Sequence, residues 1–472
     1  MKLRHLVLSL GLSAPLWAAA ATDFVQGWQA VMAHSPAYAA SVAQAAAGQA
    51  KNDQGQALWR PQVLLNAGAG WAAQRTQMDG AAFTAPGFGT SENVGFRTQV
   101  DQGLGTAVSL MVQQPLINGG RRANADQLAA MARLAELQGQ AERQGLIWRL
   151  VETHLQVLQA REAVRTTEAE AQAAAKATDA ARERYQTGAT PVTALHEAQA
   201  RHDMALAQRV QSQQALDVAE LAYQQLTGLS EAEPAALASM ALDAAPAADA
   251  LEPEATWLER AQQQGLAMRM ADESVALARA EVDKTQATSQ WSLDLVGRVS
   301  DERVRGDGPY ATAGQDARVS NRQQWLGLQL QVPLYTGGMQ SAQAREAALA
   351  LQAALARQQE VAQLQTRDVR AAWLGVRSAQ AQWQAATQAL RSAQDRQGAT
   401  RTGFDVGHRT MLELLDAERD LLQAQRQASL AQHQVLQSRL RLESLAGSLN
   451  ESSLERANRW LRTAPNTPSK TP

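Results

Sequence analysis

The chain of 472 residues contains no cysteine. This absence excludes disulfide bonds, thiolate-bound metals and a cysteine nucleophile. Aromatic residues make up only 4% of the chain, and much of its apolar content is alanine. Alanine, glutamine, leucine, arginine and glutamate dominate instead, which is typical of long, closely packed helices.

The chain also lacks a large excess of either positive or negative charge, since its formal net charge is -2. The chain therefore has no basic composition of the kind that nucleic-acid binding requires. Beyond the N-terminus there is no apolar run of about 18 residues, so we expect no transmembrane helix. The N-terminus itself has basic Lys2 and Arg4, an apolar stretch and then small residues, which predicts an export signal over residues 1–21. If the exported chain enters a membrane, it must do so as strands.

Proline is absent from two long stretches, between Pro115 and Pro191 and between Pro333 and Pro465. Because proline disrupts a helix interior, these stretches permit long helices. Each long helix is predicted to end at a short turn, after which the chain returns as a second helix. The predicted helices are 25–58, 121–184 and 192–226, and then 255–288, 341–402 and 410–446.

The most informative feature of the sequence is a repeated motif. Pro-Leu-Ile-Asn-Gly-Gly begins at Pro115, and Pro-Leu-Tyr-Thr-Gly-Gly begins at Pro333. So long a separation indicates a duplicated half rather than a solenoid unit. The predicted organisation is an export signal (1–21), a first repeat (22–228), a linker (229–254), a second repeat (255–450) and a helix remnant with a disordered tail (451–472).

Between the leading helix and the long helix of each repeat, apolar and polar residues alternate. This period predicts strands near 63–71, 100–112, 293–300 and 326–332, joined by long polar loops at 79–93 and 301–321. One apolar and one polar face fits lipid outside and water inside, although a soluble sheet with one buried face has the same pattern. Four strands cannot close a barrel in lipid, so spanning strands require several copies of the chain, with two, three or four all possible.

The two strand–Pro-Leu-x-x-Gly-Gly–helix junctions, residues 404–417 and residues 446–451 resemble the TolC family of outer-membrane efflux and secretion ducts. The resemblance covers essentially the whole mature chain. It implies a membrane α+β fold, in which a homotrimer forms a twelve-stranded outer-membrane β-barrel with four strands per chain. A long periplasmic α-helical barrel of coiled-coil hairpins would continue this barrel.

The resemblance also implies a function and partners. The protein would be the outer-membrane exit duct of a tripartite efflux pump or a type I protein secretion system. It would be a passive channel in outer-membrane lipid, with a large periplasmic portion. A periplasmic adaptor (membrane fusion) protein and an inner-membrane transporter would open its periplasmic iris gate.

Glu413 and Asp416 lie one turn apart on a predicted helix, so both carboxylates share one face. In the family, acidic positions here ring the closed tip of the tunnel. Crowded carboxylates raise one another's pKa and attract cations, so the resemblance implies a cation-selective pore constriction. An ordinary solvated charge stripe would also account for these two residues.

Arg409 matches a family arginine that holds the hairpins shut. The position of its acidic partner is Ala194, and Phe404 stands where a tyrosine hydroxyl would form a hydrogen bond. Thr193 remains as an acceptor, and Glu197 lies one turn further along. We therefore predict a gate that is latched more weakly, or one in which Arg409 pairs with Glu197.

Thr187, Gly188, Val406 and Gly407 lie at the predicted hairpin tips, where the resemblance implies docking of the adaptor. Simple turn chemistry accounts for these residues equally well. The sequence offers no Ser-His-Asp set, phosphate-binding loop or metal cluster, so we predict no enzyme activity, no cofactor and no metal. One alternative is an exported coiled-coil scaffold of the cell envelope that has no channel activity.

Overall fold

The computed structural model describes residues 22–189, 191–229, 234, 251–309, 316–406 and 408–461. The predicted export signal, most of the linker and the tail beyond residue 461 lie outside these residues. The chain divides into two compact units. The first comprises Met1–Ala46, Ala135–Asp272 and Arg357–Pro472, and the second comprises Ala47–Leu134 and Glu273–Ala356. Both units contain segments of both predicted repeats, so the repeats are not separate compact bodies.

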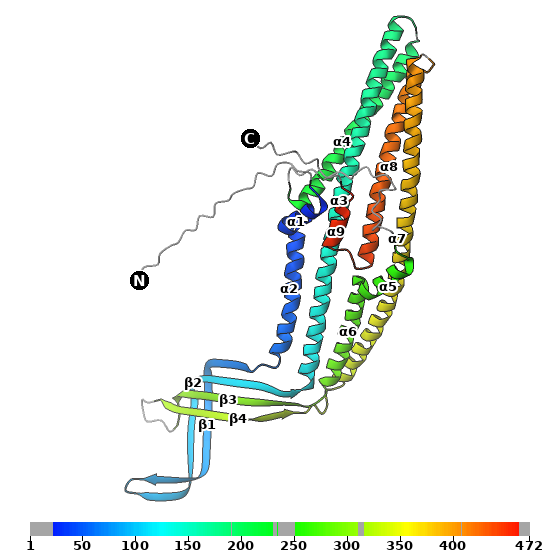
Figure 1. Cartoon of the computed structure of the whole chain (residues 1–472). Helices are drawn as coiled ribbons and strands as arrows, with labels where there is room; N and C mark the ends of the chain where they lie inside the picture. The colour runs from blue at the N-terminus through cyan, green and yellow to red at the C-terminus, as the bar shows by residue number, and fades with distance from the viewer. Residues whose placement is uncertain are drawn as a thin grey trace, which may run out of the picture. The chain divides into compact units, whose positions relative to one another are not determined.

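The second unit is built on a sheet of four antiparallel strands in the order β1-β2-β3-β4 (Figure 1). The strands are β1 (Gln62–Ala85), β2 (Gly89–Asn118), β3 (Ser292–Asp307) and β4 (Ala317–Gln331). All four predicted strands are confirmed in position, apart from Val332, which follows the end of β4. Strands β1 and β4 are the edges of the sheet, and each has one unpaired side.

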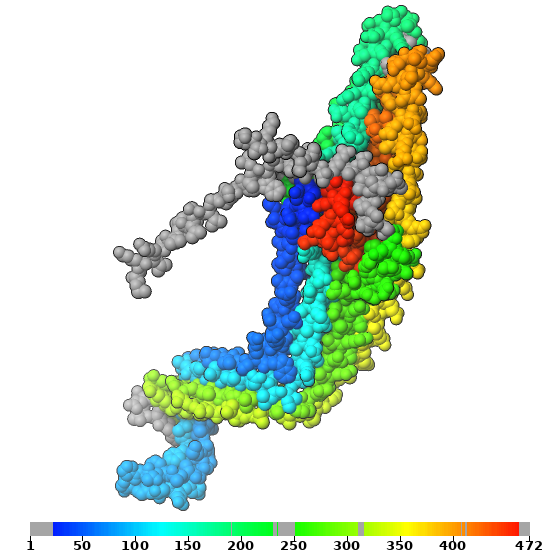
Figure 2. All heavy atoms as spheres, viewed as in Figure 1, coloured from blue at the N-terminus to red at the C-terminus, as the bar shows by residue number. Residues whose placement is uncertain are grey.

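The first two strands are much longer than the sequence predicts. β2 pairs with β3 only from Gln102 onward, whereas the β1–β2 ladder continues to Ala85 and Gly89. The resulting ribbon extends beyond β3 and β4 (Figures 1 and 2). The predicted loop over 79–93 is therefore wrong, and the one over 301–321 is too long. Polar residues suit a ribbon that is exposed on both faces, so composition did not distinguish this hairpin from a loop.

The two faces of the sheet differ as the alternation predicts. One face carries exposed apolar side chains on all four strands, among them Val63, Trp71, Leu110, Leu295, Val299, Leu326 and Leu328. The opposite face carries small and polar residues, among them Asn66, Gly68, Ser109, Ser300 and Gln329. Asp294 lies on this polar face, is only 6% exposed, and accepts a hydrogen bond from Gln113 at 2.9 Å.

Four long helices form two helical hairpins, as the proline-free stretches predict. They are α3 (Gly119–Gln186), α4 (Val192–Thr227), α7 (Met339–Asp405) and α8 (Met411–Leu445). Helices α3 and α7 contain 68 and 67 residues, which corresponds to roughly 100 Å of helix each. Helices this long act as struts rather than as elements of an ordinary globular core.

The two leading helices are interrupted, which corrects the predictions of continuous helices at 25–58 and 255–288. The observed pieces are α1 (Phe24–His34), α2 (Pro36–Ala57), α5 (Glu254–Gln264) and α6 (Leu266–Ala287). Pro36 has no N–H for a helical hydrogen bond, which ends α1. At the second break, Gln365 donates a hydrogen bond to the carbonyl of Ala261 at 2.8 Å. A Cβ atom on Gly265 would lie 1.9 Å from the Gln365 amide nitrogen and 2.3 Å from the backbone oxygen of Ala261, and the backbone contact in particular restricts this position to glycine.

Each leading helix is anchored in the first unit by a tryptophan. Trp28 packs in a cluster that includes Phe24, Leu150, Tyr223 and Leu436, and Trp257 packs with Val369, Val376 and Leu442. The last helix, α9 (Glu451–Asn458), completes the first cluster. Its residue Glu451 accepts hydrogen bonds from Trp28 at 2.8 Å and from Arg143 at 2.6 Å. These bonds join α1 to α9, which lie at opposite ends of the described chain.

Candidate functional site

The tip of the first hairpin is a tight turn between α3 and α4. The amide of Ala189 donates to the carbonyl of Arg184 at 2.8 Å, and Gly188 has a φ of 72°. Only glycine adopts this left-handed conformation without strain. Pro191 precedes α4, whose first turn receives no hydrogen bond from a capping side chain. Thr187 and Gly188 are exposed, as a docking tip requires.

The tip of the second hairpin has an equivalent turn between α7 and α8. The amide of His408 donates to the carbonyl of Gly403 at 2.8 Å, and so does the amide of Arg409 at 3.1 Å. A Cβ on Gly403 would lie 2.8 Å from Arg409 Cγ, so the glycine leaves room for the arginine. Val406 is 63% exposed. Gly407, the fourth predicted tip residue, lies outside the described residues.

Helix α8 begins with a reciprocal capping box. The Thr410 side chain accepts from the Glu413 amide at 3.2 Å, and Glu413 Oε2 accepts from the Thr410 amide at 2.7 Å. Arg409 donates to the other oxygen of the same carboxylate at 2.8 Å. The sequence contains the signal for this motif, since threonine followed three residues later by glutamate marks a helix N-terminus. Glu413 is a predicted pore residue, whereas its capping partner Thr410 is not among the predicted site residues.

These contacts determine the ionisation of Glu413. The amide of Thr410, the guanidinium of Arg409 and the hydroxyl of Thr410 together lower the pKa of Glu413 from 4.5 to about 2. Within one chain, this shift is opposite in sign to the rise expected from crowded carboxylates. The carboxylate is therefore a fixed negative charge at neutral pH.

Asp416 is also balanced by an arginine of its own helix. Arg419 lies 3.6 Å from Asp416 and 3.4 Å from Asp420, and Asp420 pairs with Arg396 at 2.8 Å. The side chain of Asp416 remains 40% exposed. The structure thus places both predicted constriction residues on the first turns of α8, each beside an arginine.

The predicted latch has a different partner within the single chain. The ion pair that Arg409 forms among the described residues is with Glu413, and not with Glu197. Thr193 and Glu197 are in the first turns of α4, and Phe404 lies at the end of α7 with its side chain half-buried. The pairing of Arg409 with Glu197 stays a prediction.

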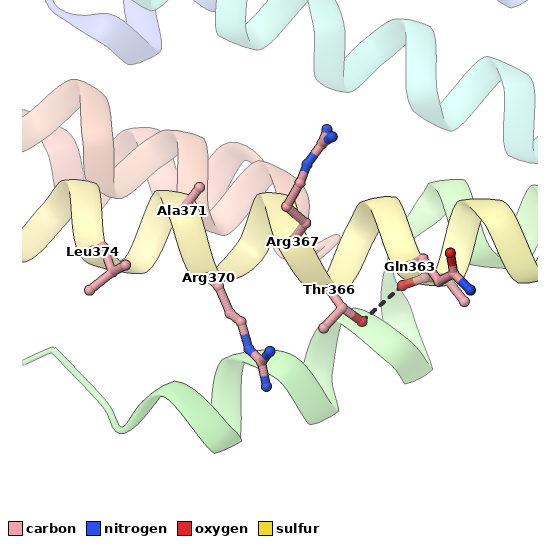
Figure 3. Close-up of a pocket in the computed structure, with 7 residues that line it drawn as sticks. Gln363, Thr366, Arg367, Arg370, Ala371 and Leu374 are labelled. Carbon is pink, nitrogen blue, oxygen red and sulfur yellow. Dashed lines mark hydrogen bonds between the residues drawn. The ribbon is translucent and has the colours of Figure 1, made fainter.

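A groove of about 640 Å³ runs along one face of α7 (Figure 3). In this view Arg367 and Arg370 point away from the helix in different directions. Arg370 pairs with Glu254 at 3.0 Å, Arg367 pairs with Asp368 at 2.7 Å, and the hydroxyl of Thr366 donates to the carbonyl of Ala362 at 2.8 Å. Both arginines and the hydroxyl of Thr366 are thus bonded to neighbours, and the groove presents no nucleophile with an adjacent base.

Membrane-spanning helices and metal-binding clusters are both absent from the described residues. Within them, no helix is both long enough and apolar enough to cross a membrane. The same part of the chain holds no group of three or more histidine, aspartate or glutamate side chains that could bind a metal ion.

Comparison with known proteins gives consistent results. The chain matches the family described as Outer membrane efflux protein over residues 28–229 and 257–448. Outer membrane protein TolC of Vibrio cholerae serotype O1 is 30% identical over 333 residues, which cover 71% of this chain and 74% of that protein. Proteases secretion protein PrtF of Dickeya chrysanthemi is 24% identical, and the match covers 98% of this chain and 96% of that protein. The CmeC outer membrane channel of Campylobacter jejuni has the same fold, with a TM-score of 0.70, 14% identity and coverage of 98% of both chains.

A four-stranded antiparallel sheet combined with two long helical hairpins is therefore the fold of an outer-membrane channel chain. This chain belongs to the outer membrane efflux protein family, which is a family of channels and not of enzymes. It is an outer-membrane exit duct for efflux or type I secretion.

Proposed function

We propose that three copies of this chain form the duct, with their sheets closing into one twelve-stranded barrel and their helical hairpins forming a tunnel in the periplasm. The support is the pair of open edges at β1 and β4. In lipid, unpaired backbone groups at such edges are unfavourable by several kcal/mol each, and pairing β4 of one copy with β1 of the next removes them. The exposed apolar face of the sheet would then contact lipid, and the polar face would line the lumen.

We propose that the helical tips form an iris gate at the periplasmic end of this tunnel. In a trimer, Glu413 and Asp416 of three chains would contribute six carboxylates to the constriction. The observation that supports this proposal is the ion pair of Arg409 with Glu413 at the first turn of α8. Both side chains are exposed, so Arg409 can exchange its partner when the hairpins move. Opening would transfer Arg409 between Glu413 of its own chain and Glu197 of a neighbouring hairpin.

We propose that a periplasmic adaptor docks on the exposed tips at Thr187, Gly188, Val406 and Gly407, and that an inner-membrane transporter supplies the energy. The duct itself performs no chemistry. The relative PrtF is named for protease secretion, so a secreted protein is one candidate cargo.

The constriction is tested by ion selectivity in planar lipid bilayers. We expect the purified protein to conduct with a preference for cations, and Glu413→Gln with Asp416→Asn to abolish most of that preference. Glu418→Gln is the control, because it removes one carboxylate charge from another face of α8. A detergent-free, water-soluble monomer without conductance would instead support the scaffold alternative.

The pH dependence of selectivity separates the two influences on Glu413. If the bonds within one chain dominate, the Glu413 charge is present above pH 4.5 and is lost only as the pH falls through its folded pKa of about 2. If crowding in the trimer dominates, cation preference declines at a higher pH. We expect the first outcome, since the capping box of α8 is formed within each chain. Loss of preference near pH 5 or above would contradict it.

The latch is tested by a double-mutant cycle on Arg409 and Glu197, with closed-state conductance as the measured quantity. We expect Arg409→Ala to increase the leak, and the effect of Glu197→Gln to be smaller when Arg409 is already absent. Independent effects of the two substitutions would rule out the pairing with Glu197. A parallel cycle on Arg409 and Glu413 measures the pairing seen within the chain.

A further inference from the structure

Four arginines gather near the end of β3 and the beginning of β4. They are Arg303, Arg305, Arg318 and Arg322, here called the arginine cluster, and all four are exposed. The register pairs Arg305 with Arg318, Arg303 with Ser320 and Asp301 with Arg322. Since alternate residues of a strand point to the same face and paired residues share it, the four side chains lie on one face.

This face is the apolar face of the sheet. Next to Asp301 and Arg322 on that face the register pairs Val299 with Gln324, and the following pairs are Gly297 with Leu326 and Leu295 with Leu328. Leu326 and Leu328 are 77% and 61% exposed. The arginine cluster therefore continues the same rows of side chains that the proposed function places against lipid.

The position of the cluster along the strands places it at one surface of the membrane. Helix α6 leads into β3 and β4 leads toward α7, so the cluster lies at the end of the sheet away from the helices. An arginine that faces the middle of the hydrocarbon layer is strongly unfavourable, whereas one near the interface is tolerated. Trp71, which is 88% exposed, shares a row of paired residues with Leu104, Arg305 and Arg318. Aromatic residues of this kind mark the interfacial level of barrels.

The ion pairs of the cluster leave it with positive charge and with free N–H donors. Asp301 accepts from Arg303 at 2.9 and 3.0 Å and also from Arg322 at 3.0 Å, so one carboxylate holds two guanidinium groups. Arg305 pairs with Asp316 at 2.6 Å, and Arg318 has no ion pair within the described part of the chain. Even when Asp307 at the end of β3 is counted, arginines outnumber aspartates on this face.

We propose that the arginine cluster binds phosphate groups of lipids in the outer leaflet, an inference that rests on the proposed insertion of the sheet in the membrane. A guanidinium donates two parallel hydrogen bonds to a phosphate, and such charge-assisted bonds are stronger than bonds to neutral groups. Asp301 fixes two of these donors side by side before any lipid binds. A phosphorylated headgroup beside the apolar band would thus meet pre-positioned donors while its acyl chains cover Leu326 and Leu328.

The test compares two lipids that differ only in phosphate. The full-length protein is placed in phosphatidylcholine nanodiscs, and bisphosphorylated lipid A or its fully dephosphorylated form is titrated and counted by native mass spectrometry. We expect the phosphorylated lipid to bind at least about tenfold more tightly, which corresponds to ~1.4 kcal/mol. Arg303→Ala with Arg322→Ala should remove this preference. Equal binding of the two lipids by the unaltered protein would overturn the proposal.

Arg298→Ala is the matched control, since Arg298 is an exposed arginine of the same strand on the opposite face. It should leave the phosphate preference unchanged, and a loss equal to that of the double variant would refute the role of the cluster. Arg318→Ala provides a second variant if the double variant does not fold, with an expected loss of several-fold. Displacement of the lipid by an equal concentration of inorganic phosphate would show a site for soluble phosphate and would also refute lipid docking.

Ion conductance of the same preparations separates this inference from the proposed function. A protein that conducts without preferring the phosphorylated lipid would contradict only the lipid site. A protein that neither inserts nor conducts would contradict the proposed duct itself.

Discussion

The two hairpin tips share a backbone turn but differ in their side chains. In the first, Ala189 bonds back to Arg184, and in the second, His408 bonds back to Gly403, each at 2.8 Å. Only the second tip then continues into a capping box and an ion pair, through Thr410, Glu413 and Arg409. The two tips thus share a turn, whereas the capping box and its ion pair occur at the second tip alone among the described residues.

The second helix of each hairpin, α4 or α8, is followed by a glycine in a left-handed conformation, and the surroundings of the two glycines differ. Gly228 directly follows α4, and Gly447 lies two residues after the end of α8, with φ angles of 72° and 73°. A Cβ added at Gly228 would meet the His34 side chain at 2.7 Å, whereas one at Gly447 would meet the backbone oxygen of Gln264 at 2.2 Å. The contacts at Gly228 include His34 Cβ at 2.8 Å, which side-chain rotation does not move. The contact at Gly447 is nevertheless closer and is with backbone, so the second joint tolerates an added methyl group less well.

The largest effect should come from substituting these two glycines. We expect Gly447→Ala to destabilise the protein by about 3–5 kcal/mol, since it combines left-handed strain with a backbone clash. Gly228→Ala should cost less, about 1–3 kcal/mol, because rotation of the imidazole relieves part of its clash and the contact that remains with His34 Cβ is longer. Urea unfolding in detergent, followed by circular dichroism, measures both. Equal losses, or a larger loss for Gly228→Ala, would contradict the difference between the joints.

A second difference between the repeats concerns a buried histidine. His433 in α8 is 4% exposed, and burial lowers its pKa from 6.5 to about 4. The corresponding position of α4, counted from the Leu-x-Gly ends, is exposed Gln214. Because the unfolded chain protonates first, stability is full above pH 6.5 and falls as the pH drops toward 4. The total loss from this residue is at most about 3 kcal/mol.

The measurement is the free energy of unfolding in detergent between pH 7 and pH 4, for the unaltered protein and for His433→Leu. We expect the variant to lose less stability over this interval. Gln214→Leu is the matched control in the other return helix and should leave the pH dependence unchanged. Identical pH profiles for His433→Leu and the unaltered protein would show that this histidine does not contribute.

The smallest effect should be at the helix starts. Thr410→Ala removes the side-chain cap of α8 and should cost about 1 kcal/mol. Thr193→Ala, in the first turn of α4 where no side-chain cap is formed, should change stability by no more than about 0.5 kcal/mol. Amide hydrogen exchange of the first turn of each helix measures this locally. A larger increase in exchange rate for Thr193→Ala in α4 than for Thr410→Ala in α8 would contradict the comparison.

Much of the architecture follows from local patterns. The proline-free stretches predicted α3 and α7 because proline excludes a continuous helix, and the alternation of Val63 to Trp71 predicted a strand because side chains alternate across a sheet. The breaks at Ser35 and Gly265 were missed. The second depends on Gln365, which is distant in sequence and reaches the end of α5 only in the folded chain.

The candidate site also combines features that the local sequence predicts with features that only the folded chain determines. The sequence located Glu413, Asp416 and Arg409 at a helix start, and the threonine-to-glutamate spacing contained the capping box as well. The contacts that lower the pKa of Glu413 depend on Arg409 and Thr410 adopting one turn geometry, which composition does not specify. The extended β1–β2 ribbon likewise required the observed pairing, since polar residues suit both a loop and a strand exposed on two faces.

The sequence by itself therefore determined the duplicated plan, the long helices, the alternating faces of the strands and the residue types at the tips. These features depend on neighbours along the chain. The tertiary structure decided which arginine neutralises which carboxylate, where the leading helices break, and that four arginines share the apolar face of β3 and β4. Those features depend on register and on contacts between distant residues, because hydrogen bonds and ion pairs form only where folding brings donor and acceptor within about 3 Å.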